Sequence, residues 1–149
     1  MPFKQPVSVL VVIHTPALEV VLLERTQHPG FWQSVTGSRE VNENLPATAA
    51  RELCEETGIE APPERFIDWR LSNRFEIFPQ WRHRYASNVT HNVEHVYSLC
   101  LPSPIPLQLA ASEHRAYRWL PWRKAADECF SWTNRDAILM LPSMCGQAA

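Results

Sequence analysis

The stretch that decides the fold is Gly37–Ile59, which reads Gly-Ser-Arg-Glu-Val-Asn-Glu-Asn-Leu-Pro-Ala-Thr-Ala-Ala-Arg-Glu-Leu-Cys-Glu-Glu-Thr-Gly-Ile. Its polar first part predicts a loop, and its alanine-rich second part predicts a helix from Pro46 to Thr57. Proline suits the first helical turn because the N–H it lacks has no partner there. Gly58 is typical of the position just past a helix end. The stretch therefore predicts a loop that leads into a helix.

The predicted helix carries three carboxylates within five residues. Glu52, Glu55 and Glu56 stand at positions i, i+3 and i+4, so they share one helical face. Like charges at these spacings repel each other, and a bound divalent cation would remove the repulsion. Carboxylate oxygens are the ligands that Mg²⁺ and Mn²⁺ prefer. The three acids alone fit an ordinary solvated helix face as well as a metal site.

The spacing of the whole segment is more specific than the three acids. Gly37 is followed by five residues, Glu43, seven residues, and then Arg51–Ile59. This pattern matches every fixed position of the Nudix box, so the segment resembles the catalytic loop–helix–loop of the Nudix hydrolase family. Members of that family cut a diphosphate linked to another moiety and use bound Mg²⁺ or Mn²⁺.

The resemblance implies an α/β fold, the Nudix α/β/α sandwich with a mixed β-sheet, formed by a single domain over residues 1–149 with the box at 37–59. It also implies that Glu43 and Arg51 pair and hold the loop against the helix. Gly37 is expected to allow a backbone turn where a strand ends. Ser38 and Asn42 stand where many Nudix proteins have glycine, which leaves the loop shape open.

Composition places the chain among ordinary globular proteins. At 149 residues with 45% hydrophobic residues, it is long enough to bury a core. A net charge of −2 argues against a broad nucleic-acid-binding surface. The four cysteines are widely spaced and predict reduced thiols of a cytoplasmic protein. The longest apolar run, Val7–Ile13, is too short to span a membrane, and no cleavage site of a signal peptide follows it.

Hydrophobic patterns outside the box predict a sheet flanked by helices. The predicted strands are Val7–His14, Glu19–Glu24, Trp32–Thr36, Phe66–Phe78 with an interruption near Ser72, Val93–Leu101 and Ala116–Leu120. Two further helices are predicted at Trp122–Cys129 and Asn134–Leu141, with Thr133 or Asn134 as the N-cap of the second.

Segments across nearly the whole chain resemble one subfamily, the bacterial dihydroneopterin triphosphate diphosphatases. These segments are Phe31–Gly37, Phe75–Phe78, Arg82–Ala86, Glu113–Leu120 and Ser131–Arg135, together with Arg25 after the second strand. The resemblance implies Mg²⁺-dependent hydrolysis of dihydroneopterin triphosphate to dihydroneopterin monophosphate and pyrophosphate, in folate biosynthesis.

The resemblance and the acidic helix face together predict the catalytic groups. The predicted catalytic residues are Glu52, Glu55, Glu56 and Glu113, and the predicted metal ligands are Glu52, Glu56 and Glu113. Mg²⁺ is the expected cofactor, and Mn²⁺ can replace it. Glu113 belongs to a separate loop, where it acts either as a metal ligand or as the base that orients water.

A pterin triphosphate needs cations for its phosphates and a flat slot for its ring. Predicted substrate-binding residues are Lys4, Arg25, Thr36, Phe75, Glu76, Ile77, Phe78, Arg82, Arg84, Ser131 and Asn134. Trp32 and Trp132 are further candidates for the slot walls, and Glu76 for accepting hydrogen bonds from the ring. Each aromatic residue fits core packing equally well, and the Arg82–Arg84 run also fits a solvated loop.

Three other functions fit parts of the pattern. A house-cleaning pyrophosphohydrolase for dATP or oxidised nucleotides keeps the chemistry and changes the substrate. A Nudix-fold module that binds a nucleotide without cutting it fits less well because all the box glutamates are present. RNA decapping is weaker still without a strong basic face. The expected partner is thus a small-molecule triphosphate, with no nucleic-acid polymer and no membrane, for a monomer or small homo-oligomer.

Overall fold

The computed structural model describes residues 2–146 and contains one sheet with helices on both sides. In chain order the elements are β1 (Val7–His14), β2 (Glu19–Arg25), β3 (Trp32–Gln33), β4 (Val35–Ser38), α1 (Leu45–Thr57), the 3₁₀ helix η1 (Pro63–Arg65), β5 (Ile67–Glu76), the 3₁₀ helix η2 (Pro79–Arg84), β6 (His91–Cys100), β7 (His114–Pro121), α2 (Trp122–Glu128) and α3 (Trp132–Met144).

The sheet is mixed, as the sequence predicts. β1 lies parallel to β6 along its whole length, from the pair Val7 and Val93 to the pair His14 and Cys100. The other pairings, β1 with β2 and β4, β2 with β3 and β7, and β5 with β6, are antiparallel. β1 is buried from its second residue to its last, which explains its nearly continuous apolar sequence.

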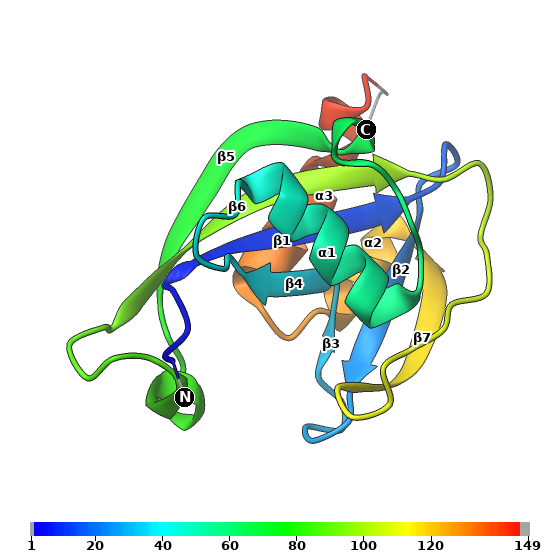
Figure 1. Ribbon diagram of the computed structural model, residues 1–149. Helices are drawn as coiled ribbons and strands as arrows, with labels where there is room; N and C mark the ends of the chain where they lie inside the picture. Colours follow the sequence, from blue (N-terminus) through cyan, green and yellow to red (C-terminus); the bar gives the residue numbers. More distant parts are fainter. Residues whose placement is uncertain (1, 147–149) are drawn as a thin grey trace.

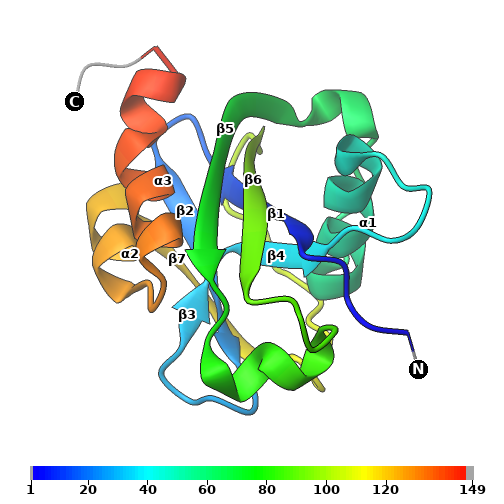
Figure 2. The ribbon, with the colours of Figure 1, turned by 90° about the vertical axis from the view of Figure 1, so that its left-hand side faces the viewer.

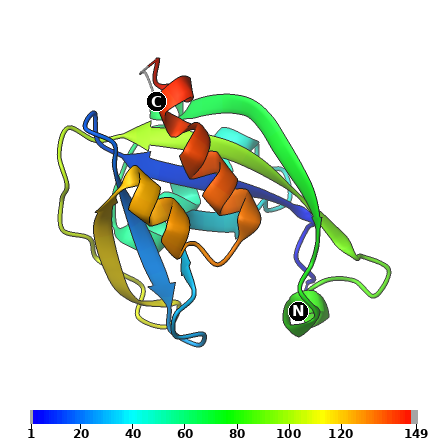
Figure 3. The same cartoon turned by 180° about the vertical axis from the view of Figure 1, so that it is seen from behind.

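Two apolar cores lie on the two faces of this sheet. Helix α1 covers one face, where Leu53 packs with alternate residues of β1, such as Val9 and Val11. Helices α2 and α3 cover the other face, where Ile138 packs with Leu10 and residues of the same β1 face. Figure 1 shows α1 in front of the sheet. Figure 3, the view from behind, shows α2 and α3 in orange on the opposite face. Figure 2 shows all three layers from the side. The predicted α/β/α arrangement is confirmed.

The start of α3 differs from the prediction. The N-cap is Ser131, whose side chain accepts a hydrogen bond from the Asn134 N–H, so the helix begins at Trp132. Thr133 and Asn134 are buried and lie inside the first turn, so neither is the N-cap. The expectation of a cap at Thr133 or Asn134 is therefore wrong, because the serine two residues earlier supplies the capping oxygen.

The region between β5 and β6 also carries more structure than the sequence predicts. The pairing of β5 with β6 shifts register between Asp68 and Ser72, close to the predicted interruption, and Arg70 there has a φ of 52°. The basic run expected as a loop forms η2, which ends at Arg84. Within residues 2–146, no helix is both long and apolar enough to cross a membrane.

Candidate active site

Arg51 holds the loop before α1 against the helix. Its Nε donates to Glu43 over 2.8 Å, one terminal nitrogen donates to the Ser38 carbonyl over 2.9 Å, and the other donates to Glu52 over 2.8 Å. Hydrogen bonds from the guanidinium lower the pKa of the Glu43 carboxyl to about 2. The predicted pairing of Glu43 and Arg51 is confirmed, and it fixes the loop to the acidic face of α1.

Gly37 has a different role from the expected one. Its φ is not positive and it lies inside β4, so it forms no turn. A side chain at this position would instead overlap the Glu52 carboxyl, which packs directly against the Gly37 Cα. Asn42, the departure from glycine in the loop, has a φ of 65°, a left-handed conformation that asparagine tolerates better than most residues. The loop therefore keeps a glycine-like shape.

Glu56 is the most deeply buried acid of the helix. The residue is 2% exposed, and its Oε1 has no hydrogen-bond partner among the described residues. Burial, the shared hydrogen bond with Glu52 and the charges of Glu52 and Glu113 raise the pKa of Glu56 well above its ordinary value. His114 Nε2 lies 3.9 Å from Oε1, but burial lowers the pKa of His114 to about 4, so the imidazole is neutral and supplies no charge.

These residues fit a divalent cation by chemistry. Glu52, Glu55, Glu56 and Glu113 all line one cavity, and the partnerless oxygen of Glu56 is a ready acceptor for a cation. Among residues 2–146, no three acidic, histidine or cysteine side chains enclose a metal position. Arg51 lies among the acids of the helix, 2.8 Å from one oxygen of Glu52 and 3.3 Å from Glu55. Arg51 is thus a counter-charge for Glu52 and Glu55, whereas Glu56 and Glu113 form no ion pair with it among the described residues.

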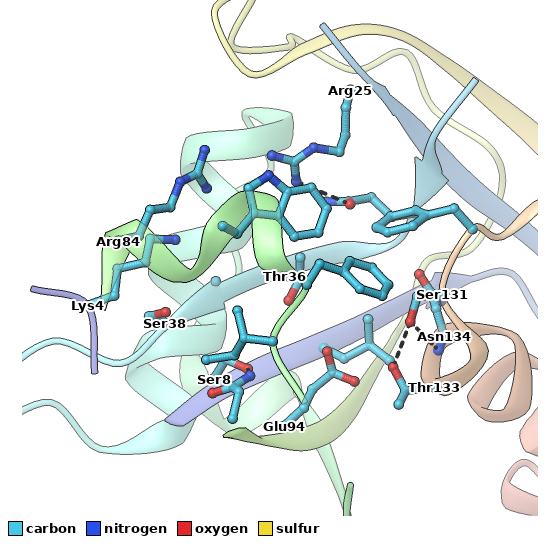
Figure 4. A pocket seen from close by; sticks show the side chains of 18 of the residues that line it. Lys4, Ser8, Arg25, Thr36, Ser38, Arg84, Glu94, Ser131, Thr133 and Asn134 are labelled. Carbon is cyan, nitrogen blue, oxygen red and sulfur yellow. Dashed lines mark hydrogen bonds between the residues drawn. The ribbon is translucent and has the colours of Figure 1, made fainter. Parts of the chain in front are cut away.

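Three cations face the same cavity from separate parts of the chain. Lys4 precedes β1, Arg25 ends β2 and Arg84 ends η2, and Figure 4 shows them along one side of the pocket. Desolvation, and after it the charge of Arg84, lowers the pKa values of Lys4 and Arg25. No carboxylate in residues 2–146 forms an ion pair with any of them. They are free to bind an anion.

The cavity has a volume of about 830 Å³, within the range of small-molecule sites. Aromatic side chains form much of its wall: Phe75, Phe78, Trp81, Phe130 and Trp132. Trp81 packs against Phe78 and Phe130 with ring centroids 5.3 and 6.0 Å apart, and Arg25 lies 4.8 Å above its ring. The aromatic wall therefore continues directly into the cationic side of the pocket.

Most predicted substrate-binding residues line this cavity, and Arg82 does not. Arg82 instead lies 3.6 Å from Glu76, whose side chain is 70% exposed at the rim. Ile77 lines the cavity and is itself buried. Trp32, a candidate wall, is buried in the core with Arg118 over its ring. Trp81 and Phe130 form the wall in its place.

The three predicted polar contacts, Thr36, Ser131 and Asn134, already hold parts of the fold together. The Thr36 hydroxyl donates to the Val9 carbonyl, and Ser131 caps α3. The Asn134 oxygen accepts from the Ser34 N–H over 2.7 Å, and its nitrogen donates to the Ser34 hydroxyl over 3.0 Å. Asn134 thereby ties α3 to the segment between β3 and β4.

The sequence interpretation missed a polar group at the floor of the cavity. It consists of Ser8 from β1, Asn92 and Glu94 from β6, and Thr133 from α3, and all four are buried. One signal was available: Asn92 and Glu94 stand two residues apart in a strand, so they point to the same face as the apolar Val96. Two polar residues on a core-facing position are unusual enough to mark a site.

Comparison with known proteins agrees with this geometry. A sequence model of the NUDIX domain matches residues 4–141. The chain is 45% identical over 139 residues to dihydroneopterin triphosphate diphosphatase of Escherichia coli K12, covering 91% of each chain. It is 41% identical over 143 residues to the Haemophilus influenzae protein of the same name, covering 93% of this chain and 88% of the relative.

Its fold also matches a solved structure, that of the E. coli dihydroneopterin triphosphate pyrophosphohydrolase. The TM-score is 0.85 at 44% sequence identity, over 93% of this chain and 95% of the other. The box at residues 37–59, the helix-flanked mixed sheet and these matches lead to one conclusion: the chain belongs to the Nudix hydrolase family.

Proposed function

We propose that the protein hydrolyses dihydroneopterin triphosphate to dihydroneopterin monophosphate and pyrophosphate, with Mg²⁺ as cofactor, as a step of folate biosynthesis. One observation carries the proposal: a single cavity of about 830 Å³ joins the acidic face of α1, an aromatic wall and three cations that form no ion pair with a carboxylate of residues 2–146. The names of the relatives at 41–45% identity support the same substrate.

Each part of the cavity has a task in this reaction. Lys4, Arg25 and Arg84 bind phosphate oxygens, and the arginines offer forked donors that suit them. The aromatic wall holds the flat ring. Nudix hydrolases generally use divalent metal ions, and here Glu52, Glu56 and Glu113 would hold Mg²⁺. When bound, the ion would neutralise negative charge on the phosphates and lower the pKa of the water bound to it.

The chemical step balances without a covalent intermediate on the protein. A water oxygen attacks phosphorus, the phosphoanhydride bond breaks, and pyrophosphate leaves with the bonding electrons. Glu113 is exposed in the cavity lining just before β7, and in this proposal it orients the water or accepts its proton. Phosphoryl transfer of this kind depends mostly on positioning and on electrostatic stabilisation, which this arrangement of acids and cations supplies.

The test compares initial rates on dihydroneopterin triphosphate, dATP, dGTP and 8-oxo-dGTP with Mg²⁺, detecting pyrophosphate. The proposal predicts the highest kcat/KM for the pterin, with the monophosphate and pyrophosphate as products. A higher kcat/KM for a nucleotide would replace the proposed substrate with the house-cleaning alternative and leave the Nudix chemistry in place. No hydrolysis of any of the four would favour a binding module.

Cytoplasmic location and a monomeric or small homo-oligomeric state stay predictions.

A further inference from the structure

The floor of the cavity contains a buried carboxyl that the proposed reaction does not use. Glu94 is 5% exposed and lies on β6, beside Ser8 of β1. The Thr133 hydroxyl bonds to its carboxyl, and its Oε1 is buried without a partner among the described residues. Figure 4 shows Glu94 near Thr133, on the far side of the pocket from Lys4 and Arg84. The cations Lys4 and Arg84 and the Glu94 carboxyl therefore line different parts of one cavity.

Asn92 places a second acceptor beside Glu94. Its nitrogen donates to the Ser8 hydroxyl over 2.7 Å, and its Oδ1 is buried without a partner in the described chain. Both residues line the cavity and sit two positions apart on one strand, so their side chains point to the same face. Leaving a buried acceptor without a hydrogen bond costs about 1–3 kcal/mol. Two such oxygens at one cavity floor indicate a ligand that brings N–H donors.

The surroundings of Glu94 are not those of a metal ligand, because a divalent cation takes several oxygen ligands with charge among them. No ion pair within residues 2–146 reaches Glu94, and its neighbours Ser8, Asn92 and Thr133 are all neutral. The acids of α1 share one helical face, whereas Glu94 is the one acid in the group of Ser8, Asn92, Glu94 and Thr133. A flat, neutral ring with adjacent N–H groups satisfies a lone carboxylate without bringing a second charge into the site.

We propose that Glu94 is the residue that selects the ring: its carboxylate accepts two hydrogen bonds from adjacent ring N–H and amino groups, with Asn92 Oδ1 as a further acceptor. The class of ligand is a 2-amino-4-oxo heterocycle, the edge that pterins share with guanine. Glu76, the sequence-based candidate for this contact, lies at the exposed rim and faces Arg82. For the pterin itself, this inference rests on the proposed function. The predicted preference for guanine over adenine nucleotides can be tested independently of that function.

Adenine presents a different edge, which makes the proposal testable. Its amino group donates a hydrogen bond, but the ring nitrogen beside that group is an acceptor. An ionised carboxylate therefore makes one hydrogen bond with adenine, and its second oxygen is repelled by the lone pair of the ring nitrogen. The substitution Glu94→Gln reverses the match, because a carboxamide accepts from the adenine amino group and donates to the ring nitrogen. A good bidentate pair discriminates between bases by roughly 10- to 100-fold.

The experiment measures kcat/KM for dihydroneopterin triphosphate, dGTP, dITP and dATP with wild type, Glu94→Gln and the control Glu19→Gln. Glu19 is a half-buried strand glutamate outside the cavity. At about pH 8 Glu94 is ionised, since burial raises its pKa to about 7. Glu94→Gln should lower the ratio of dGTP to dATP by about 10- to 100-fold, and the control should leave that ratio unchanged.

The outcomes separate the inference from the proposed function. An equal loss on all four substrates, or no change in the ratio, overturns the role of Glu94 and leaves the pterin assignment standing. A shifted ratio in an enzyme that prefers nucleotides keeps the role of Glu94 and removes the pterin assignment. Should the variant fail to fold, wild type alone decides: dITP lacks the 2-amino group, and a kcat/KM equal to that of dGTP contradicts the proposal.

Discussion

Two glutamates, Glu56 on α1 and Glu94 on β6, are buried in the lining of the same cavity. Their surroundings, here called the Glu56 end and the Glu94 end, differ in one respect. Both are at most 5% exposed, and each has an oxygen without a hydrogen-bond partner in the described chain. Glu56 shares a hydrogen bond with Glu52 and feels the charge of Glu113, so negative charge accumulates around it. The neighbours of Glu94 at the cavity floor, Ser8, Asn92 and Thr133, are neutral, and the Thr133 hydroxyl bonds to its carboxyl.

The difference shows how the same side chain acquires different uses. A buried carboxylate among other carboxylates is stabilised by a cation, which removes repulsion as well as filling the vacant oxygen. A buried carboxylate among neutral groups is stabilised by its own proton or by neutral donors from a ligand. We therefore expect the metal and the phosphates at the Glu56 end and the ring at the Glu94 end.

The largest expected effect comes from removing the charge at the Glu56 end. Glu56→Gln keeps the shape of the side chain but is a poor Mg²⁺ ligand, so we expect kcat to fall by about 10³-fold, since a bound metal stabilises the transition state by several kcal/mol. Steady-state kinetics with a series of Mg²⁺ concentrations measures this loss. Activity near that of wild type at saturating Mg²⁺ would remove the assigned role of Glu56.

The Glu94 end should be visible in the pH dependence of stability. Burial raises the pKa of folded Glu94 to about 7 from 4.5, so between these values the unfolded chain releases a proton that the folded chain keeps. The free energy of unfolding of the wild type should therefore fall by about 3 kcal/mol relative to Glu94→Gln as the pH rises from 4.5 to 7. Denaturant unfolding in metal-free buffer measures the difference, and a difference that stays flat over this range contradicts the assigned environment.

A smaller effect on activity is expected from Gly37→Ala, which tests the Glu56 end without removing a charge. The added Cβ would overlap the Glu52 carboxyl, which must turn away from β4. The moving group is the flexible end of a side chain, so the fold should persist with little change in Tm. Displacing a catalytic group by about 1 Å costs about 10²-fold in rate, and kcat should fall by that order. Unchanged kcat with unchanged Tm would show that the position of Glu52 is not critical.

The two ends also differ in how well the sequence predicts them. The Glu56 end is contiguous: its helix, its acids and the pairing of Glu43 with Arg51 all follow from spacing within 23 residues, and the structure confirms the pairing. Even there the expected role of Gly37, a backbone turn, was wrong. Glycine is needed at this position because the Glu52 carboxyl, fifteen residues away in the sequence, packs against it. Such a contact depends on how β4 packs against α1.

The Glu94 end could not be read from the sequence in the same way. Ser8, Glu94 and Thr133 come together only because β1 pairs with β6 in one particular register and α3 begins above them. Nothing local links these positions, whereas strand and helix positions followed from hydrophobic patterns to within a few residues. Trp81 and Phe130 escaped prediction for the same reason, since their cluster forms between η2 and the segment before α3.

The division between the two buried carboxylates is tested most directly by metal binding without turnover. Free Mn²⁺ is titrated by electron paramagnetic resonance against wild type, Glu56→Gln and Glu94→Gln in the absence of substrate. We expect Glu56→Gln to weaken Mn²⁺ binding by at least about 10-fold, because a carboxylate ligand is lost. Glu94→Gln should bind Mn²⁺ as wild type does. Equal affinity in wild type and Glu56→Gln, or a loss confined to Glu94→Gln, would contradict this division.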